Sequence, residues 1–315
     1  QEILLKDLKA IFFVNDLAGS PAHTESNQFA PGKPIFGRKI SVVFKDGEIW
    51  RMFLGAAASD STALALGYSS PDLETWQYDG IVAQRNSSET EGAWSGAMWE
   101  CPQIFPLGDR HAMVTSVWQE DKLHYAASCV GDYASGRFHQ QEWSQLSYGS
   151  SNYAPSYFLD RDGRPALMFW LRGIGGESAG WSSAQSIPYL IELVNEKVVA
   201  RPHPDIEKYH RPLVGRVSAL DASWTPVGGS ALTFTDASGE VARIGLAGKQ
   251  LTVVSQTGDN WTMPYNGGRV RAILDGPILE VCTDDGLGAI HLGSEIGGVA
   301  IACTAGELVA AELAR

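Results

Sequence analysis

One carboxylate, Glu100, stands in a setting that suits acid–base chemistry. The stretch "GAMWECPQIFPL" places it between Trp99 and Cys101-Pro102, ahead of an apolar run. Burial among apolar groups disfavours the charged form of a carboxylic acid and raises its pKa. A carboxyl group that keeps its proton near neutral pH is what a general acid needs. An aromatic neighbour such as Trp99 could also stack on the C–H face of a sugar.

Two interpretations of Glu100 stay open on its local pattern. It is either a catalytic acid or a buried glutamate tied to a structural arginine, and the pattern alone favours the structural role. If Glu100 is a catalytic acid, its partner still has to be found in the chain.

The negative net charge of the chain argues against some classes of ligand. The chain has 315 residues and a formal net charge of −12, and its Lys and Arg residues form no cluster. An acidic chain without a basic patch argues against nucleic acid and anionic membranes as partners. Neutral small molecules remain, carbohydrates among them.

Neither a membrane span nor a metal or cofactor site is expected. No apolar run reaches transmembrane length, and the given chain shows no signal peptide. We therefore expect a soluble protein, cytoplasmic or secreted, whose compartment the sequence leaves unknown. The cysteines Cys101, Cys129, Cys282 and Cys303 lie far apart and form no Cys-x-x-Cys pair or His/Cys cluster.

Short strands separated by turn residues predict an all-β protein. "KISVVF" and "EIWRMFLGAA" flank Lys45-Asp46-Gly47, and "SYFLD" and "PALMFWLRG" flank Arg161-Asp162-Gly163. Two strands joined by an Asp-Gly turn indicate a β-hairpin. Strands at 8–12-residue spacing without helical periodicity are typical of a propeller, a sandwich or a barrel.

The expected domain boundary lies near residue 200. Tryptophans recur through the first two-thirds at intervals like those of propeller blades, which take roughly 40–50 residues each. The sequence pattern changes near three prolines, Pro202, Pro204 and Pro212. About a hundred residues of alternating strands and turns follow, which is the size of a β-sandwich. We therefore predict a β-propeller of the catalytic type over residues 1–200 and a β-sandwich over residues 201–315.

The wider surroundings of Glu100 resemble glycoside hydrolase family 32, the β-fructosidases. The resemblance rests on "MWECPQIFPLGDRHAMVTSV", "ALGYSSPDLETWQYDG", the "YAPS" segment and "RVRAILDGPILEVCTDDG", which occur in the family's order. It covers the chain from about residue 36 to the end. The resemblance implies a five-bladed propeller followed by a sandwich, and a retaining mechanism.

The family's site implies roles for particular positions. Glu100, in its E-C-P motif, corresponds to the general acid/base. A nucleophilic Asp attacks the fructosyl anomeric carbon, and the Asp of an R-D-P motif holds fructose hydroxyls. In this chain Lys39-Ile40-Ser41 stand where R-D-P is expected. Lys39 can replace the Arg as a cation but without its fork geometry, and Ile40 cannot accept a hydrogen bond. An alignment shifted by one residue puts Arg38 at the Arg position and still supplies no carboxylate.

The nucleophile has one candidate, Asp16. The stretch "FVNDLAGS" partly resembles the family's W-M-N-D-P-N-G motif. This match would make Asn15 a substrate-binding residue and Asp16 the nucleophile. The spacing argues against this, since Asp16 lies only 40 − 16 = 24 positions before Ile40. The alternative is that "KAIFFVND" is an ordinary late strand of the first blade.

Further substrate-binding candidates follow from the same motifs. Tyr153 of "YAPS" and Cys101 of "ECP" match positions that line the fructosyl pocket in the family. Trp99 and Trp170 are candidate wall residues, with a core role as the alternative for each.

The sequence predicts a shortened or incomplete first blade, since five blades need more residues than the chain offers before its sandwich. A homo-oligomer or a partner chain could cover the exposed strand edges. The expected function is that of a retaining glycosidase or fructosyltransferase acting on sucrose or fructan. The alternatives are a catalytically degenerate sugar-binding protein and a subunit that needs a partner chain.

Overall fold

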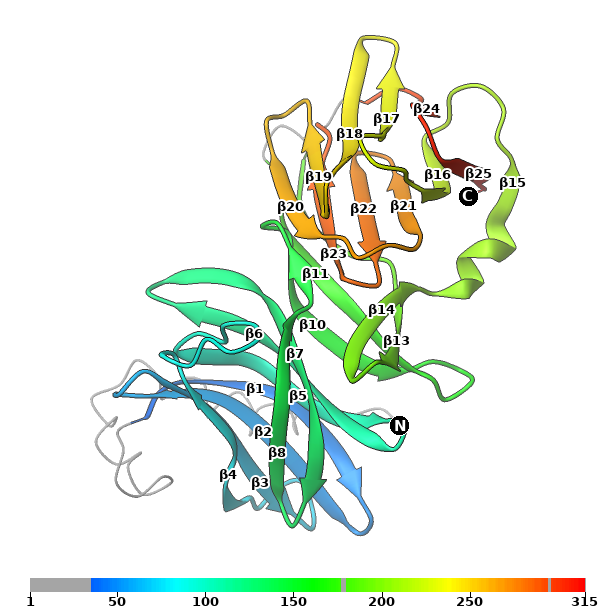
Figure 1. The fold of residues 1–315 in the computed structure, drawn as a ribbon. Coiled ribbons are helices and arrows are strands. Elements are labelled where there is room, and N and C mark those ends of the chain that lie inside the picture. The colour runs from blue at the N-terminus through cyan, green and yellow to red at the C-terminus, as the bar shows by residue number, and fades with distance from the viewer. Residues whose placement is uncertain (1–34, 177–179, 294–295, 315) are drawn as a thin grey trace. The chain divides into compact units, whose positions relative to one another are not determined.

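The computed structural model describes residues 35–176, 180–293 and 296–314, with backbone alone for residues 35–41. Contacts divide the chain into two compact units, each described here by itself. The first unit comprises residues 1–145 together with 154–156 and 195–198, and the second comprises the rest. Figure 1 shows the strands of both units along the chain.

The first unit contains two four-stranded sheets with the same simple up-and-down order, β1-β2-β3-β4 and β5-β6-β7-β8. The strands of the first sheet are β1 (Ile35–Asp46), β2 (Ile49–Ala58), β3 (Thr62–Ser70) and β4 (Gln77–Asn86). Those of the second are β5 (Met98–Leu107), β6 (Arg110–Gln119), β7 (Lys122–Ala134) and β8 (Arg137–Gln145). Four-stranded antiparallel meanders are the blades of a β-propeller.

Strand β2 explains how the two sheets pack. Its run "MFLGAAA" is buried throughout, which is typical of a strand covered on both faces. Phe53 joins Trp99 and Met113 in the cluster between the sheets, while Leu54 belongs to a second cluster on the other face. The edge strand β1 pairs with β2 and contacts β5, so the first strands of the two sheets are neighbours.

A third sheet of the blade type has the order β10-β11-β13-β14, with β12 paired to β11. Most of its residues belong to the second unit, while parts of β10 and β14 belong to the first. Its strands are β10 (Asn152–Leu159), β11 (Pro165–Gly176), β12 (Trp181–Gln185), β13 (Tyr189–Val194) and β14 (Lys197–Pro202). A short 3₁₀ helix, η4 (Pro204–Tyr209), follows β14. His203 caps this helix by accepting the backbone N–H of Asp205, one of the donors that a helix N-terminus leaves unpaired.

Two further sheets in the second unit form a β-sandwich. One has seven strands in the order β15-β25-β16-β21-β22-β23-β9, and the other has five in the order β20-β19-β18-β17-β24. Their bounds are β9 (Ser147–Tyr148), β15 (His210–Pro212), β16 (Ala219–Thr225), β17 (Ala231–Asp236), β18 (Gly239–Ala247), β19 (Gln250–Ser255), β20 (Asn260–Pro264), β21 (Val270–Asp275), β22 (Ile278–Thr283), β23 (Gly286–His291), β24 (Ala300–Cys303) and β25 (Glu307–Leu313).

The sandwich core follows from the alternation of side chains along each strand. On β16, Leu220, Ala222 and Trp224 are fully buried in the core cluster, while Asp221 and Ser223 point to the outer face of the seven-stranded sheet. The facing sheet supplies Phe234 and other apolar residues to the same cluster. Strict alternation of this kind is the pattern of a sheet with one face on a core.

The predicted all-β class, with propeller-type sheets and a sandwich, is confirmed. The hairpins expected at the Asp-Gly turns are present as β1-β2 and β10-β11. The described residues hold three blade-type sheets. The prediction of a shortened or incomplete first blade concerns residues outside the described part. The boundary expected near residue 200 stays a prediction; it falls at β14, whereas contact clustering divides the chain after Gln145.

Within the described residues, no helix is both long enough and apolar enough to cross a membrane. The helical content there is limited to short turns such as η4.

Candidate active site

Glu100 lies on β5, the first strand of the second sheet, and is almost fully buried, with 3% of its surface exposed. Its backbone is fixed from the neighbouring strand: Glu100 is paired with Ser116 of β6, and the Thr115 hydroxyl donates to the Glu100 carbonyl oxygen at 3.0 Å. The carboxylate is therefore held by a rigid element, as a catalytic group must be.

A β-bulge follows Glu100 directly. Pairing with β6 jumps from Glu100 to Gln103, so that Cys101 and Pro102 face a single residue, Thr115. Cys101 has a φ of 51°, a left-handed conformation that is uncommon for a residue other than glycine. Proline inside a sheet is found at bulges, because it cannot donate to the ladder. The sequence Cys-Pro thus bends β5 just after the carboxylate.

Within the first unit, two hydrogen bonds join strands β5 and β6 to Ala154 and Pro155, the last two residues of the Y-A-P motif. The Ser116 hydroxyl accepts the backbone N–H of Ala154 at 2.9 Å, and the Gln103 side chain donates to the carbonyl oxygen of Pro155. Ser116 and Gln103 are both buried. Ala154 itself has a φ of 43°, so the backbone at this contact is locally constrained. The two motifs therefore form one structural element.

Lys39 and Ile40, at the positions where R-D-P is expected, are paired with the part of β2 that packs against the Glu100 strand. In the β1-β2 pairing, Lys39 lies opposite Gly55 and Ile40 opposite Leu54. A Cβ atom on Gly55 would lie 2.0 Å from the carbonyl oxygen of Trp99, so β2 touches the backbone next to Glu100 there. Only glycine permits such an approach. The positions predicted to correspond to R-D-P are therefore on β1, a strand that contacts β5, the strand of Glu100.

Trp99 lies in the core. It is fully buried, its ring centroid is 5.2 Å from that of Trp143, and its indole N–H donates to the Ser95 carbonyl oxygen at 3.1 Å. The guanidinium of Arg85 stacks on Trp143, 5.3 Å from its ring centroid. These contacts favour the core alternative for Trp99 over a role as a substrate wall.

The remaining described candidates have different surroundings. Tyr153, in the second unit, is buried, and the Arg172 guanidinium lies 4.9 Å from its ring centroid. Trp170, on β11 of the same unit, is 39% exposed. Cys101 is partly exposed in the bulge beside Glu100. Asn15 and Asp16 lie outside the described residues, as does the side chain of Lys39.

In the first unit, a pocket of about 580 Å³ is lined by Arg85, Glu89, Gln140 and Trp143 among others. Among the described residues no group of three or more His, Cys, Asp and Glu side chains is placed to hold a metal ion.

Sequence reasoning missed the supporting residues of this site. The strand that carries Glu100 is fixed by four residues that were not predicted from the sequence, namely Ser116, Gln103, Gly55 and Ala154. The Gln that follows E-C-P and the Pro of Y-A-P, whose carbonyl oxygen accepts the hydrogen bond of that Gln, are visible in the motifs. Their pairing is not, because it joins segments about fifty residues apart.

Comparison with known families then decides the relationship. The sequence profile of the glycosyl hydrolases family 32 N-terminal domain matches residues 38–202, just over half of the chain. The chain belongs to glycoside hydrolase family 32. The family 32 match contains the E-C-P strand, the Y-A-P segment and all three blade-type sheets from Arg38 onward. A profile of a family of unknown function (DUF6982) matches residues 1–72 and overlaps the family 32 match.

Curated relatives and solved structures agree with this membership. The chain is 31% identical over 176 residues to a sucrose-6-phosphate hydrolase of Salmonella typhimurium, covering 51% of this chain and 37% of that protein. It is 25% identical over 187 residues to a raffinose invertase of Escherichia coli, covering 55% and 38%. The chain therefore spans less than two fifths of the length of these relatives.

The fold extends to solved family 32 structures at low identity. A β-fructofuranosidase of Bombyx mori matches with a TM-score of 0.73 at 17% identity, covering 89% of this chain and 66% of that one. A sucrose-6-phosphate hydrolase of Lactobacillus gasseri matches with a TM-score of 0.69 at 14% identity, covering 89% and 66%. The shared architecture includes the sandwich as well as the blades.

Proposed function

We propose that this protein is a retaining glycoside hydrolase that acts on β-fructofuranosides, with Glu100 as its general acid/base. The observation that carries the proposal is the buried Glu100, held on the first strand of a blade by a bulge, in a chain of glycoside hydrolase family 32. The curated relatives are named for the hydrolysis of sucrose 6-phosphate and raffinose. Sucrose, its 6-phosphate and raffinose are therefore the first substrates to test.

In this proposal Glu100 donates a proton to the leaving glycosidic oxygen, so that the bond to the fructosyl carbon can break. The same group then takes a proton from the water that releases the sugar, as the retaining mechanism requires. Its strand is fixed by Thr115, Ser116 and Gln103, which keep the backbone of the acid from moving during these two steps.

The second carboxylate of the mechanism is proposed to be Asp16. A retaining enzyme needs a nucleophile whose carboxyl group lies ~5–5.5 Å from that of the acid. Asp16 is proposed for this role because the Asn-Asp-x-x-Gly pattern around it resembles the family's motif. The proposed substrate contacts are Asn15, Lys39, Cys101, Tyr153 and Trp170.

Hydrolysis and its stereochemistry test the proposal. The protein would be incubated with sucrose, sucrose 6-phosphate, raffinose, inulin and levan, and released fructose would be measured. Methanol added as acceptor should give the methyl β-fructofuranoside, the product with retained configuration. Glu100→Gln should lower the rate by about 10²–10⁴-fold. Glu74→Gln, an exposed change in the same unit, should leave the rate unchanged. Absence of turnover by the parent protein on all five substrates would end the proposal.

A second candidate, binding without hydrolysis, is favoured by one observation, the Ile40 at the position of the family's R-D-P aspartate. That position lies beside the strand of Glu100, and an apolar side chain there cannot hold fructose hydroxyls. The relatives are hydrolases by name and do not favour this candidate. Calorimetry with the same sugars separates the two, since a pure binder gives heat of binding and no fructose.

The predicted oligomer or partner chain is not needed for this proposal. Light scattering of the purified protein would give its mass in solution and check that prediction directly.

A further inference from the structure

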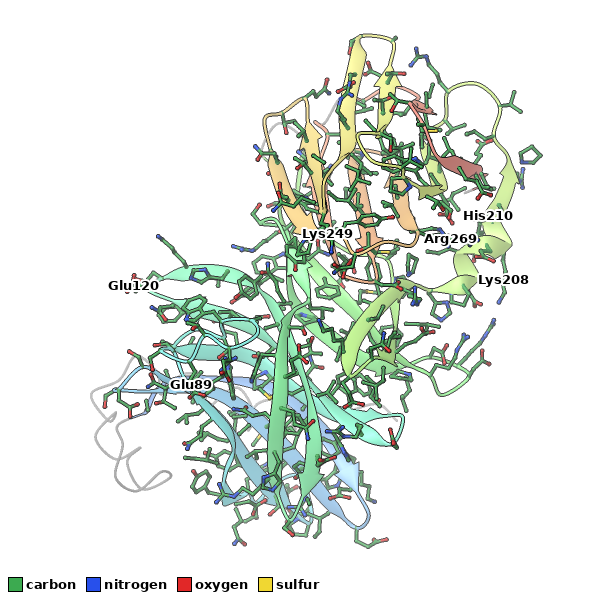
Figure 2. All side chains as sticks on the ribbon, in the orientation of Figure 1. Glu89, Glu120, Lys208, His210, Lys249 and Arg269 are labelled. Atoms are coloured by element: carbon green, nitrogen blue, oxygen red, sulfur yellow. The ribbon has the colours of Figure 1, made fainter. Side chains whose placement is uncertain are left out.

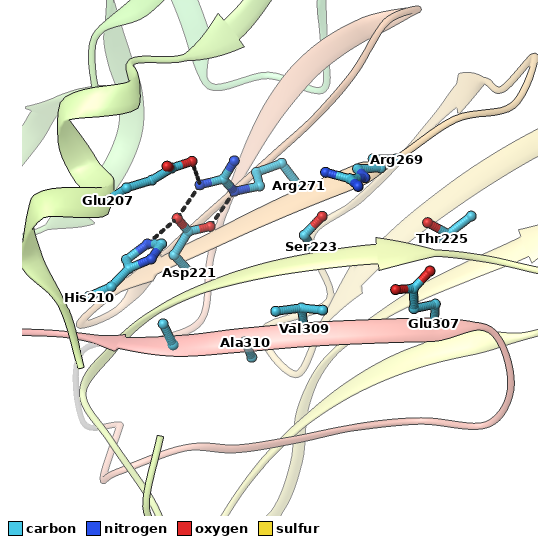
Figure 3. A pocket seen from close by; sticks show the side chains of 11 residues that line it. Glu207, His210, Asp221, Ser223, Thr225, Arg269, Arg271, Glu307, Val309 and Ala310 are labelled. Carbon is cyan, nitrogen blue, oxygen red and sulfur yellow. Dashed lines mark hydrogen bonds and ion pairs between the residues drawn. The ribbon is translucent and has the colours of Figure 1, made fainter. Parts of the chain in front are cut away.

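A polar pocket lies on the outer face of the seven-stranded sheet of the sandwich. Its volume is about 300 Å³, and it is lined from η4, β15, β16, β21 and β25 within the second unit. Alternate residues of β16, namely Asp221, Ser223 and Thr225, form its floor. Figure 2 places His210 and Arg269 on this part of the sandwich, and Figure 3 shows the pocket from close by.

One end of the pocket is organised by a buried charge network. Asp221 is 3% exposed and accepts two hydrogen bonds from the Arg271 guanidinium, one of them from Nε at 2.5 Å. The Nε2 atom of His210 lies 2.8 Å from Asp221 Oδ2, and Glu207 lies 3.6 Å from Arg271. Burying such a pair costs desolvation that an apolar face would not, so sheet stability alone does not explain it.

The other end carries polar side chains that are not part of this network. They are Ser223, Thr225, Arg269 and Glu307, shown apart from the dashed interactions in Figure 3. Within the described part of the chain, none of these four side chains makes a hydrogen bond or ion pair with another protein group. Arg269 offers a planar fork of donors, and Glu307 offers two acceptor oxygens.

An apolar surface lies between these polar groups. Val309 is paired with Ser223 across the β16-β25 ladder and is 63% exposed. Such a side chain can cover the C–H face of a ring whose edges carry hydroxyl groups. Donors, acceptors and a small apolar contact thus line one concavity, the combination that small-molecule sites use.

The balance of charge indicates a neutral ligand. The pocket holds the guanidinium groups of Arg269 and Arg271 against the carboxylates of Glu207, Asp221 and Glu307. An anion would meet three carboxylates, whereas adjacent sugar hydroxyls can donate to Glu307 and accept from Arg269 at once. We propose that this pocket is a carbohydrate-binding site, separate from Glu100, that takes a neutral sugar unit without cleaving it.

This inference does not rest on the proposed hydrolase activity, and its test uses the whole chain. Calorimetry would be run on the Glu100→Gln variant, so that turnover does not consume the probe. The probes are sucrose, inulin, levan, maltose and, as an anion, inorganic phosphate. At least one sugar should bind, and Arg269→Ala and Glu307→Gln should each weaken that binding tenfold or more.

Matched controls keep the result interpretable. Arg211→Ala removes an exposed arginine from β15 outside the pocket and should leave sugar binding unchanged. Thermal unfolding of each variant checks that the sandwich is intact. The proposal would be overturned if neither pocket substitution changed the number of bound sugars or their affinity relative to the Glu100→Gln protein, or if no sugar bound at all. Phosphate binding that depends on Arg269 would also overturn it, because it would mark an anion site.

Discussion

Glu100 and Ser116 lie directly opposite each other on β5 and β6, and the Ser116 hydroxyl accepts the backbone N–H of Ala154 at 2.9 Å. The Ser116 side chain thereby connects β6, the strand paired with that of the proposed acid, to the Y-A-P segment, and Gln103 connects β5 itself to Pro155. Such a connection positions a catalytic group without touching the substrate.

Replacing Ser116 by Ala should therefore lower activity and stability together. The buried N–H of Ala154 loses its acceptor, which costs about 1–3 kcal/mol, and we expect kcat to fall more than KM rises. The control is Ser128→Ala: Ser128 is buried on β7, and its hydroxyl has no hydrogen-bond partner among the described residues. Equal kcat values for the two variants would remove Ser116 from the positioning of Glu100.

Gly55→Ala should destabilise the first unit strongly. The added methyl group would lie 2.0 Å from the Trp99 carbonyl oxygen, and neither strand can move without breaking its ladder. Overpacking of this kind costs about 3 kcal/mol or more. Gly245→Ala is the control, since nothing lies within 4 Å of a Cβ there. Urea unfolding followed by tryptophan fluorescence measures both, and a normal midpoint for Gly55→Ala would contradict the close approach.

Glu280→Gln should change how stability depends on pH. Glu280, on β22, accepts hydrogen bonds from the Ile187 N–H and the Tyr189 hydroxyl, each at 2.8 Å. Burial raises the pKa of Glu280 from 4.5 to about 7, while these two hydrogen bonds lower it in part. The folded protein thus holds this proton more tightly than the unfolded chain does.

The sign follows by linkage. Stability from the protonated carboxyl is present below about pH 4.5 and is lost as the pH rises to about 7, on the order of 3 kcal/mol. A glutamine keeps both contacts, accepting from Ile187 and donating to Tyr189, so the variant should lack this loss. Urea unfolding from pH 5 to pH 8 measures the difference. Parallel profiles for parent and variant would contradict it, and Glu240→Gln, exposed on β18, serves as control.

Asp16→Asn tests the proposed nucleophile. Loss of a nucleophile should reduce kcat on the order of 10³-fold or more, with the fold intact by circular dichroism. Azide added to the variant should restore part of the activity, because it can attack the fructosyl carbon in place of the carboxylate. Activity within a few-fold of the parent would exclude Asp16 from the reaction.

Ile40→Asp tests the alignment of the degenerate motif. If Ile40 occupies the position of the R-D-P aspartate, a carboxylate there should hold fructose hydroxyls and raise kcat/KM about tenfold or more. Ile40→Asn is the control for polarity without charge. Unchanged kcat/KM in a folded Ile40→Asp protein would show that residues 38–41 do not form this part of the site.

The sequence was sufficient for what depends on local pattern and on family motifs. The Asp-Gly hairpins, the presence of a sandwich in the last third of the chain and the E-C-P strand followed from residues close together in the chain. The role of Trp99 could not be decided, because a buried tryptophan and a sugar platform share the same flanking residues. Gly55 could not be predicted either, since its requirement comes from a strand more than forty residues away.

The bulge at Cys101-Pro102 has one more consequence. Glu100 and Gln103 are paired with Ser116 and Val114, which are two positions apart and so share a face of the sheet. In a regular strand, residues three apart would point to opposite faces. The extra residue thus shifts the alternation of side chains along β5 by one position. As a result, the side chains of Glu100 and Gln103 lie on the same face of the sheet, and the apolar residues that follow remain on the faces that the shifted alternation gives them. The motif should accordingly tolerate substitution at Cys101 far better than its deletion, which would turn half of the strand inside out.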